Sequence, residues 1–304
     1  MYGRVVDIYR ECVRNPGYRD YLRFKLLRSI GCEFGSTADI LVNPSLPSPM
    51  AASIARQVAR LRRTPTDYLE NPFEFLGARI KYLAEQQFRY LIEEIFVDGC
   101  YWFPSNRVDP VIIDCGSNIG ISILFFKALY PQATVIGFEP DPTTFGVLVE
   151  NMHENKHLNV ELHNVALCDR DTNIDFYTSP ERRGLLTMSA CPERLPGLAI
   201  TVPGKPLSPF IGERVDLMKM DIEGSEDVVM AELETSGALQ RISRIHLEYH
   251  HHIDQIRDVM SGILALLERN GFGYQIRAAC PGWPEPGVFE DVAIFAYQKS
   301  LLFE

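Results

Sequence analysis

The sequence predicts an α/β protein with one open sheet of seven strands, a helical N-terminal region and a β-hairpin insertion. The run Val111-Ile112-Ile113 indicates a strand buried on both faces, and it leads through a glycine loop into an apolar helix. Strand and helix patterns then alternate almost to the C-terminus, as is typical of parallel sheets. Residues 169–210 interrupt this alternation with short β signals between Pro, Gly and Ser, which indicates an inserted hairpin.

The residues before this sheet carry helical patterns separated by turn residues. Asn15-Pro16-Gly17 divides the first pattern into two helices, and a Pro- and Ser-rich linker follows at 43–49. We therefore expect two domains, a helical N-terminal region at 1–100 and an α/β domain at 101–304. The helical patterns of the first region cover 4–30, 51–63 and 71–96.

The α/β domain is expected to contain seven strands and four intervening helices. Each strand is a short β-branched or apolar run, and each helix has apolar residues at helical spacing. The expected strands are 111–115, 134–138, 160–167, 215–220, 242–249, 272–278 and 288–297, and the expected helices are 121–130, 143–154, 226–234 and 253–270.

Charge limits the classes of partner. The 304-residue chain has a net charge of −10, which argues against a nucleic-acid substrate. Residues 1–64 hold eleven Lys or Arg against five Asp or Glu, a balance of +6 that leaves −16 on the remainder. This basic head predicts either weak peripheral contact with anionic lipid or simply a solvated helix face, and the second is the simpler interpretation.

Apolar segments and cysteine spacing indicate the cellular compartment. The sequence contains no apolar run long enough to span a bilayer, and the first residues lack the apolar centre of a secretory signal. The seven cysteines are scattered without a Cys-x-x-Cys pair, which indicates reduced thiols. We expect a cytoplasmic protein, and the sequence leaves its oligomeric state open.

The glycine loop and a spaced acid indicate a nucleoside-containing ligand. Gly116 and Gly120 allow close approach of a ligand, and Glu139, at the tip of the next strand, can accept both hydroxyls of a ribose. The spacing G-x-N-x-G is not the G-x-G-x-x-G of a dinucleotide site, and no P-loop Lys-Ser/Thr pair follows. The alternatives are therefore a class I S-adenosylmethionine site or a tight turn that binds nothing. The expected cofactor-binding residues are Asp114, Gly116, Ser117, Asn118, Gly120 and Glu139, with Asn164 and Ala166 at the adenine ring.

A charged block follows the fourth strand of the α/β domain. Lys219, Asp221 and Glu223 alternate along the chain, so an extended backbone would turn them to one side, at the sheet edge where ligands bind. We expect this group to face the transferred methyl. The simpler alternative is that Lys219 pairs structurally with one of the two carboxylates.

The fifth strand ends in Glu248 and His250, which share a face and should lie near Asp221. Because His titrates near neutrality, His250 is our first choice of general base, with Glu223 or Glu248 behind it. A divalent ion held by these groups is an alternative, but no metal is predicted. We expect His251 and His252 to belong to a solvated loop.

Four motifs resemble the FkbM-type S-adenosylmethionine-dependent methyltransferases. The resemblance covers roughly 95–298, and its most specific part is the Lys-x-Asp-x-Glu-Gly block, while the first hundred residues lie outside it. It implies a class I methyltransferase Rossmann-like sheet and O-methylation of a hydroxyl on a sugar, glycolipid or polyketide-like secondary metabolite. The family's usual Gly-Ala-Asn is Gly-Ser-Asn here. The motifs are 113–120, 138–142, 164–167 and 219–226.

Two rival functions have different signatures. A non-catalytic adenosine-binding module would not need the convergent acids and histidine of the fourth and fifth strands. A nucleic-acid methyltransferase would need an Asn/Asp-Pro-Pro-Tyr/Phe turn and a basic face, and the sequence has neither. We therefore expect a methyltransferase with a small-molecule or glycan acceptor.

Overall fold

The computed structural model describes residues 40, 42–157, 159–178, 188–191, 198–251, 259–278 and 290–302. Several expectations lie outside these residues: the two helices expected in 4–30, the loop position of His252, and the thiols of Cys12, Cys32 and Cys280. The chain divides into two compact units, which are described separately. The first holds the described residues up to Ile80 together with Glu85–Trp102, and the second holds Lys81–Ala84 and the described residues from Phe103 onward.

The first unit combines helices with a short hairpin. Its elements are α3 (Ser48–Arg63), β1 (Phe73–Phe75), β2 (Ala78–Ile80), α4 (Glu85–Leu91) and a π-helix, η2 (Ile92–Val97). The hairpin corrects the continuous helical pattern expected from Asn71 onward. Leu76 and Gly77 both have positive φ, of 51° and 82°, as a tight two-residue hairpin turn requires. Phe73 and Phe75 are buried at alternate positions, so their spacing is that of a strand.

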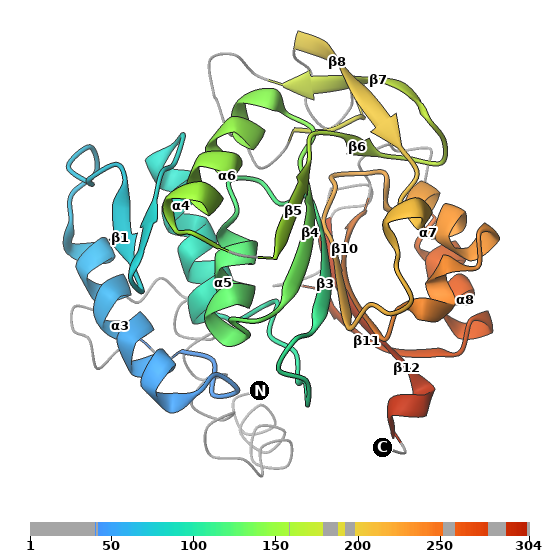
Figure 1. Ribbon diagram of the computed structural model, residues 1–304, viewed down its shortest axis with the longest axis horizontal. Helices are drawn as coiled ribbons and strands as arrows, with labels where there is room; N and C mark the ends of the chain where they lie inside the picture. Colours follow the sequence, from blue (N-terminus) through green and yellow to red (C-terminus); the bar gives the residue numbers. More distant parts are fainter. Residues whose placement is uncertain are drawn as a thin grey trace, which may run out of the picture. The chain divides into compact units, whose positions relative to one another are not determined.

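The second unit contains the expected seven-stranded sheet, in the order β11-β12-β10-β9-β3-β4-β5 (Figure 1). The strands from β10 to β5 are parallel, whereas β12 runs antiparallel to both β10 and β11. The fold class expected from the sequence is therefore confirmed. The strands are β3 (Val111–Cys115), β4 (Thr134–Phe138), β5 (Val160–His163), β9 (Leu217–Met220), β10 (Arg244–His251), β11 (Phe272–Ala278) and β12 (Glu290–Gln298).

Helices cover both faces of this sheet, with α5 and α6 on one side and α7 and α8 on the other (Figure 1). Asp141 caps α6, because its carboxylate accepts from the Thr144 N–H at 2.8 Å and Pro142 occupies the first turn. The core joins α7 and α8 to the sheet through buried aliphatic side chains such as Val229, Leu233 and Leu267. The helices are α5 (Ile121–Leu129), α6 (Pro142–Glu154), α7 (Glu226–Thr235) and α8 (Met260–Arg269), with 3-10 turns η3 (Ser208–Phe210), η4 (Ala238–Arg241) and η5 (Lys299–Leu302).

The insertion forms a separate three-stranded sheet in the order β6-β8-β7. Its long strands, β7 (Thr172–Thr178) and β8 (Leu198–Lys205), pair antiparallel as the hairpin prediction requires. The expected third strand at 160–167 is divided, since β5 ends at His163 and β6 (Ala166–Leu167) pairs with β8 instead. The Asn164 amide donates to the Glu139 and Pro140 carbonyls at this point, which fixes the change of direction.

None of the helices in the described part of the chain is long and apolar enough to cross a bilayer. The strand β10 extends to His251, which corrects the solvated loop expected there. His251 pairs with Glu290 of β12 and its ring lies against Tyr249, with ring centroids 5.6 Å apart.

Candidate active site

The glycine loop joins the buried end of β3 to α5 by an unusually close approach to a neighbouring strand. Gly116 has a φ of +82°, and a Cβ added there would lie 1.9 Å from the Asp221 carbonyl oxygen. Gly120 has a φ of +92°, and its added Cβ would meet Leu148 and Met152 at 2.7 and 2.8 Å. Both positions therefore require glycine. Gly116 brings the loop against the segment that follows β9, and Gly120 brings it against α6.

The N–H groups of this loop are used inside the protein. Gly116 and Ser117 donate to the Phe138 carbonyl at 3.0 and 2.8 Å, and Gly120 donates to Ser117 at 2.8 Å. The Ile119 N–H donates to the Asn118 side chain at 2.8 Å. These four N–H groups therefore already have acceptors within the protein.

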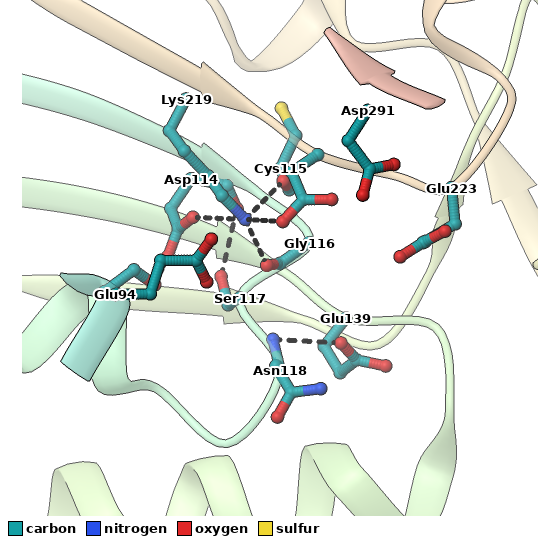
Figure 2. A network of polar contacts seen from close by, with 12 residues as sticks. Glu94, Asp114, Cys115, Gly116, Ser117, Asn118, Glu139, Lys219, Glu223 and Asp291 are labelled. Carbon is teal, nitrogen blue, oxygen red and sulfur yellow. Dashed lines mark hydrogen bonds and ion pairs between the residues drawn. The ribbon is translucent and has the colours of Figure 1, made fainter. Parts of the chain in front are cut away.

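Glu139 follows β4 and lies beside the loop. Its carboxylate accepts from the Asn118 N–H at 3.0 Å (Figure 2). It also accepts from the Asp141 N–H at 2.9 Å. Burial raises the pKa of Glu139 to about 8, and the two N–H donors only partly oppose this rise. In its ionised form Glu139 has about four acceptor positions, so two would remain for hydroxyl donors.

The two residues expected at the adenine ring lie just beyond β5. The Asn164 amide holds the Glu139 and Pro140 carbonyls at 2.8 and 3.0 Å, so this side chain fixes the loop that carries Glu139. Ala166 is buried in the small sheet together with Phe176 and Val202. The role of both residues at adenine stays a prediction.

Lys219 is the centre of the polar network between β3 and β9 (Figure 2). Its ammonium donates to the Gly116 carbonyl at 2.6 Å and the Cys115 carbonyl at 3.2 Å. It also lies 3.3 Å from Asp221 and 3.6 Å from Asp114. Lys219 thus ties the glycine loop to the strand that carries the acidic block, which is the structural pairing left open by the sequence.

Charge compensation controls the pKa values in this network. Burial lowers the pKa of Lys219, but Asp221 and Asp114 outweigh burial and raise it above its ordinary value. Burial alone would raise the pKa of Asp221, whereas Lys219 and His250 lower it below the usual range. Asp114 is fully buried and accepts from the Ser122 hydroxyl at 2.6 Å. Asp114 and Asp221 therefore depend on Lys219 for their compensation.

His250 brings the acidic groups of three segments together. Its Nε2 lies 3.3 Å from Glu223, 3.6 Å from Asp221 and 3.9 Å from Asp291, while its Nδ1 lies 2.7 Å from Glu226. Burial lowers the pKa of His250, but these carboxylates, Glu226 foremost, raise it well above its ordinary value. The surrounding carboxylates therefore favour the protonated imidazole.

The sequence-predicted residues of the fourth and fifth strands meet only in part. Asp221 and Glu223 each lie within ion-pair distance of His250. Lys219 contacts Asp221 but donates to the carbonyls of the glycine loop. Glu248 lies two residues before His250 on β10, and its charge contributes to the raised pKa of Lys219.

Three further residues support this cluster and were missed from the sequence. Glu226 begins α7 and holds the Nδ1 of His250, and Asp291 pairs with His250 in the register of β10 and β12. Ser189, from the insertion, is fully buried and its hydroxyl donates to the Glu223 carbonyl. Only Glu226 had a local signal, since it lies three residues after Glu223 at a helix start. The other two depend on pairing between distant segments.

The residues around the glycine loop fit S-adenosylmethionine. Glu139 offers buried acceptor oxygens beside this loop. Asp114 Oδ1 is buried with no hydrogen-bond donor among the described residues, although Lys219 lies 3.6 Å away. The site thus presents buried oxygen acceptors, which suit a ligand that carries ribose hydroxyls and positive charge.

Comparison with known proteins gives the family. Residues 114–274 match the Methyltransferase FkbM domain. The chain is 31% identical over 224 residues to Methyltransferase 1 of Beauveria bassiana, covering 67% of this chain and 87% of that protein. It is 27% identical to the 31-O-demethyl-FK506 methyltransferase FkbM of Streptomyces tacrolimicus (64% and 86% covered) and 30% identical to the 2-O-methyltransferase NoeI of Sinorhizobium fredii (49% and 66% covered). The chain is a methyltransferase and belongs to the FkbM methyltransferase family.

Proposed function

We propose that this protein transfers the methyl group of S-adenosylmethionine to a hydroxyl oxygen of a sugar, glycolipid or polyketide-like secondary metabolite. The observation that carries the proposal is the acid and histidine cluster around His250, next to the glycine loop. The names of two relatives, which specify a 31-O and a 2-O position, support oxygen as the acceptor atom. Family membership supports S-adenosylmethionine as the methyl donor.

On the cofactor side, we assign binding to residues of the glycine loop and the two strand ends beside it. Glu139 is the acceptor for the ribose hydroxyls, because its carboxylate is buried, lies beside the loop and keeps free acceptor positions. When bound, the cofactor supplies a methyl group already activated by a sulfonium. The remaining assigned residues are Asp114, Gly116, Ser117, Asn118 and Gly120, with Asn164 and Ala166 at adenine.

On the acceptor side, the protein must take a proton from the attacking hydroxyl. His250 remains our candidate base, but its raised pKa means that Nε2 must first lose a proton. Glu223 lies 3.3 Å from Nε2, and with Glu248 it is the alternative base. Asp221 and Lys219 hold the cluster against the cofactor loop, so we assign Lys219 to positioning. This arrangement lets the protein align oxygen, methyl and sulfur, which is the main requirement of the reaction.

We propose that residues 101–304 are the catalytic domain and that residues 1–100 are an accessory region. The insertion is the best candidate for shaping the acceptor pocket, because Ser189 holds the Glu223 carbonyl and Cys191 lies 3.6 Å from the Gly224 carbonyl. The side chains that would recognise a particular acceptor follow no known code, so the acceptor must be found by experiment.

The test is a screen of purified protein with S-adenosylmethionine labelled in its methyl group. Sugar nucleotides, glycolipids and polyketide alcohols serve as acceptors, with amines, DNA and RNA as controls. We expect the labelled methyl group in a methyl ether formed on one alcohol class, with its position assigned by NMR. Transfer to nitrogen or to nucleic acid, with no transfer to any alcohol, would contradict the proposal.

A further inference from the structure

Asp221, Glu223 and His250 form a possible metal triad at the edge of the sheet. One ligand atom from each residue lies within 4.8 Å of the other two. We propose that this triad binds one divalent cation of the Mn²⁺ and Mg²⁺ class. Cation binding does not depend on the methyl-transfer reaction, whereas the role of the cation in catalysis rests on the function proposed above.

The distances in the triad suit a single ion. His250 Nε2 lies 3.3 Å from Glu223 Oε2 and 3.6 Å from Asp221 Oδ1. An octahedral ion with bonds of about 2.1 Å separates neighbouring ligand atoms by about 3 Å and opposite ones by about 4.2 Å. Small side-chain rotations would therefore bring all three atoms onto one ion.

Glu226 supports the triad from behind His250. Its Oε1 lies 2.7 Å from Nδ1 and also accepts from the Gly224 N–H at 3.0 Å. A metal-ligating histidine nearly always donates its second N–H to such a carboxylate, which fixes the ring and the tautomer. With Nδ1 occupied in this way, Nε2 is the nitrogen directed at Asp221 and Glu223.

Asp221 can bind the ion without breaking its existing ion pair. Its Oδ2 lies 3.3 Å from Lys219, whereas Oδ1 is the oxygen that faces His250. One oxygen therefore connects the cluster to the cofactor loop while the other is directed into the triad. The same histidine also forms a set with Glu248 and Asp291, but Asp291 has a side chain that is 49% exposed, so the more enclosed triad is the better site.

The local charge also favours a cation. Four largely buried carboxylates lie within ion-pair distance of Lys219 or His250. A divalent ion in the triad would place positive charge among these carboxylates, which bind metal in their deprotonated form. The carboxylates are those of Asp114, Asp221, Glu223 and Glu226.

The ligand set indicates the kind of ion and its use. Two carboxylates and one imidazole, with no thiolate, suit Mn²⁺ and Mg²⁺ better than soft metals. Three protein ligands leave coordination positions open for an acceptor. A hydroxyl oxygen bound there would have a lowered pKa, so the cation would perform the activation otherwise assigned to His250.

The test measures Mn²⁺ binding by the full-length protein after treatment with chelator, without cofactor or acceptor. Titration followed by electron paramagnetic resonance counts bound ions, and electron spin echo modulation detects a coordinated nitrogen. We expect one ion per chain with a ¹⁴N signal. His250→Ala should abolish that signal, and Glu223→Gln should weaken binding at least tenfold, while Glu226→Gln should weaken it ten- to a hundredfold.

Glu161→Gln is the matched control, because Glu161 lies 2.8 Å from His163 in a second histidine–carboxylate pair outside the triad. Its Mn²⁺ affinity should equal that of the wild type, and circular dichroism checks that each variant is folded. No binding at millimolar Mn²⁺, or equal binding by folded His250→Ala, would overturn the site. Full methyl transfer in excess chelator would reject a catalytic cation yet leave the proposed function intact. Binding without transfer to any alcohol would do the reverse.

Discussion

The ends of β4 and β9 hold buried acids in opposite electrostatic settings. Glu139, after β4, has N–H donors as partners and no ion pair with a described residue, and burial raises its pKa to about 8. Asp221, after β9, lies within 3.6 Å of both Lys219 and His250, and its pKa is lowered. Burial opposes the ionisation of both acids, so the neighbouring groups decide whether each acid is charged. We infer that the first end suits hydroxyl donors and the second suits cations and proton transfer.

The largest effect should come from forcing the glycine loop away from the segment that follows β9. Gly116→Ala would place a Cβ 1.9 Å from the Asp221 carbonyl in a left-handed backbone. We expect a loss of about 3–5 kcal/mol in the free energy of unfolding, together with loss of cofactor binding. Urea denaturation measures the first and calorimetry the second.

Gly237→Ala provides the control for backbone strain alone. Gly237 has a similar φ of +73°, but an added Cβ there meets no atom within 4 Å. Its loss should be about 1–2 kcal/mol. Equal losses in the two variants would show that the loop contact contributes nothing to stability.

The next effect concerns the end of β9, where Asp221 lies between Lys219 and His250. His250→Ala and Asp221→Asn should each lower turnover about a hundredfold or more, because each removes a group from the proton-transfer cluster. Cofactor affinity should stay within a few fold, since neither side chain belongs to the assigned cofactor site. Single-turnover kinetics with labelled cofactor separates the two quantities. Normal turnover by His250→Ala on the true acceptor would assign the base to Glu223 or Glu248.

The next prediction concerns the pH dependence of stability, which Glu139 at the end of β4 should control. The folded pKa of Glu139 is about 8, above its ordinary 4.5, so the folded protein holds a proton that the unfolded chain has lost in this range. The stabilisation is complete below pH 4.5 and disappears as the pH rises through 8. Glu139→Gln removes this dependence, so its stability relative to wild type should increase between pH 5 and 9 in urea titrations. A constant difference would mean that Glu139 is not desolvated.

The smallest effect should come from the insertion. Ser189→Ala removes the hydroxyl that donates to the Glu223 carbonyl. Glu223 has a positive φ of 57°. We expect turnover to fall about three- to tenfold, from the loss of one hydrogen bond that positions Glu223. Thr201→Ala, at an exposed position on β8, is the control and should keep full turnover. A loss of cofactor affinity instead of turnover would contradict the positioning role.

The sequence was most informative where a pattern is local. The buried run of β3, the glycine loop and the cap of α6 each depend on adjacent residues, and the seven-stranded sheet was predicted from such runs. The hairpin at Phe73–Ile80 was missed because its turn, Leu76-Gly77, lies within a longer apolar pattern. The division of the third strand depends on the Asn164 amide, whose partners lie 24 and 25 residues away.

The site divides in the same way. Asp221 and His250 were expected to meet because neighbouring parallel strands end at one edge, and they lie 3.6 Å apart. The orientation of Lys219 toward Gly116 was not predicted, because alternation along a strand does not fix where a long side chain ends. The raised pKa of His250 depends foremost on Glu226, which packing alone brings to Nδ1.

The most direct test of the division between the two ends compares Glu139→Gln with Asp221→Asn in one assay. Calorimetric titration with S-adenosylmethionine and its demethylated product gives cofactor affinity, and turnover on the identified acceptor gives the chemistry. The account predicts that Glu139→Gln loses at least tenfold in affinity while Asp221→Asn binds within a few fold of wild type and loses turnover. Retained affinity in Glu139→Gln, or lost affinity with normal chemistry in Asp221→Asn, would contradict it.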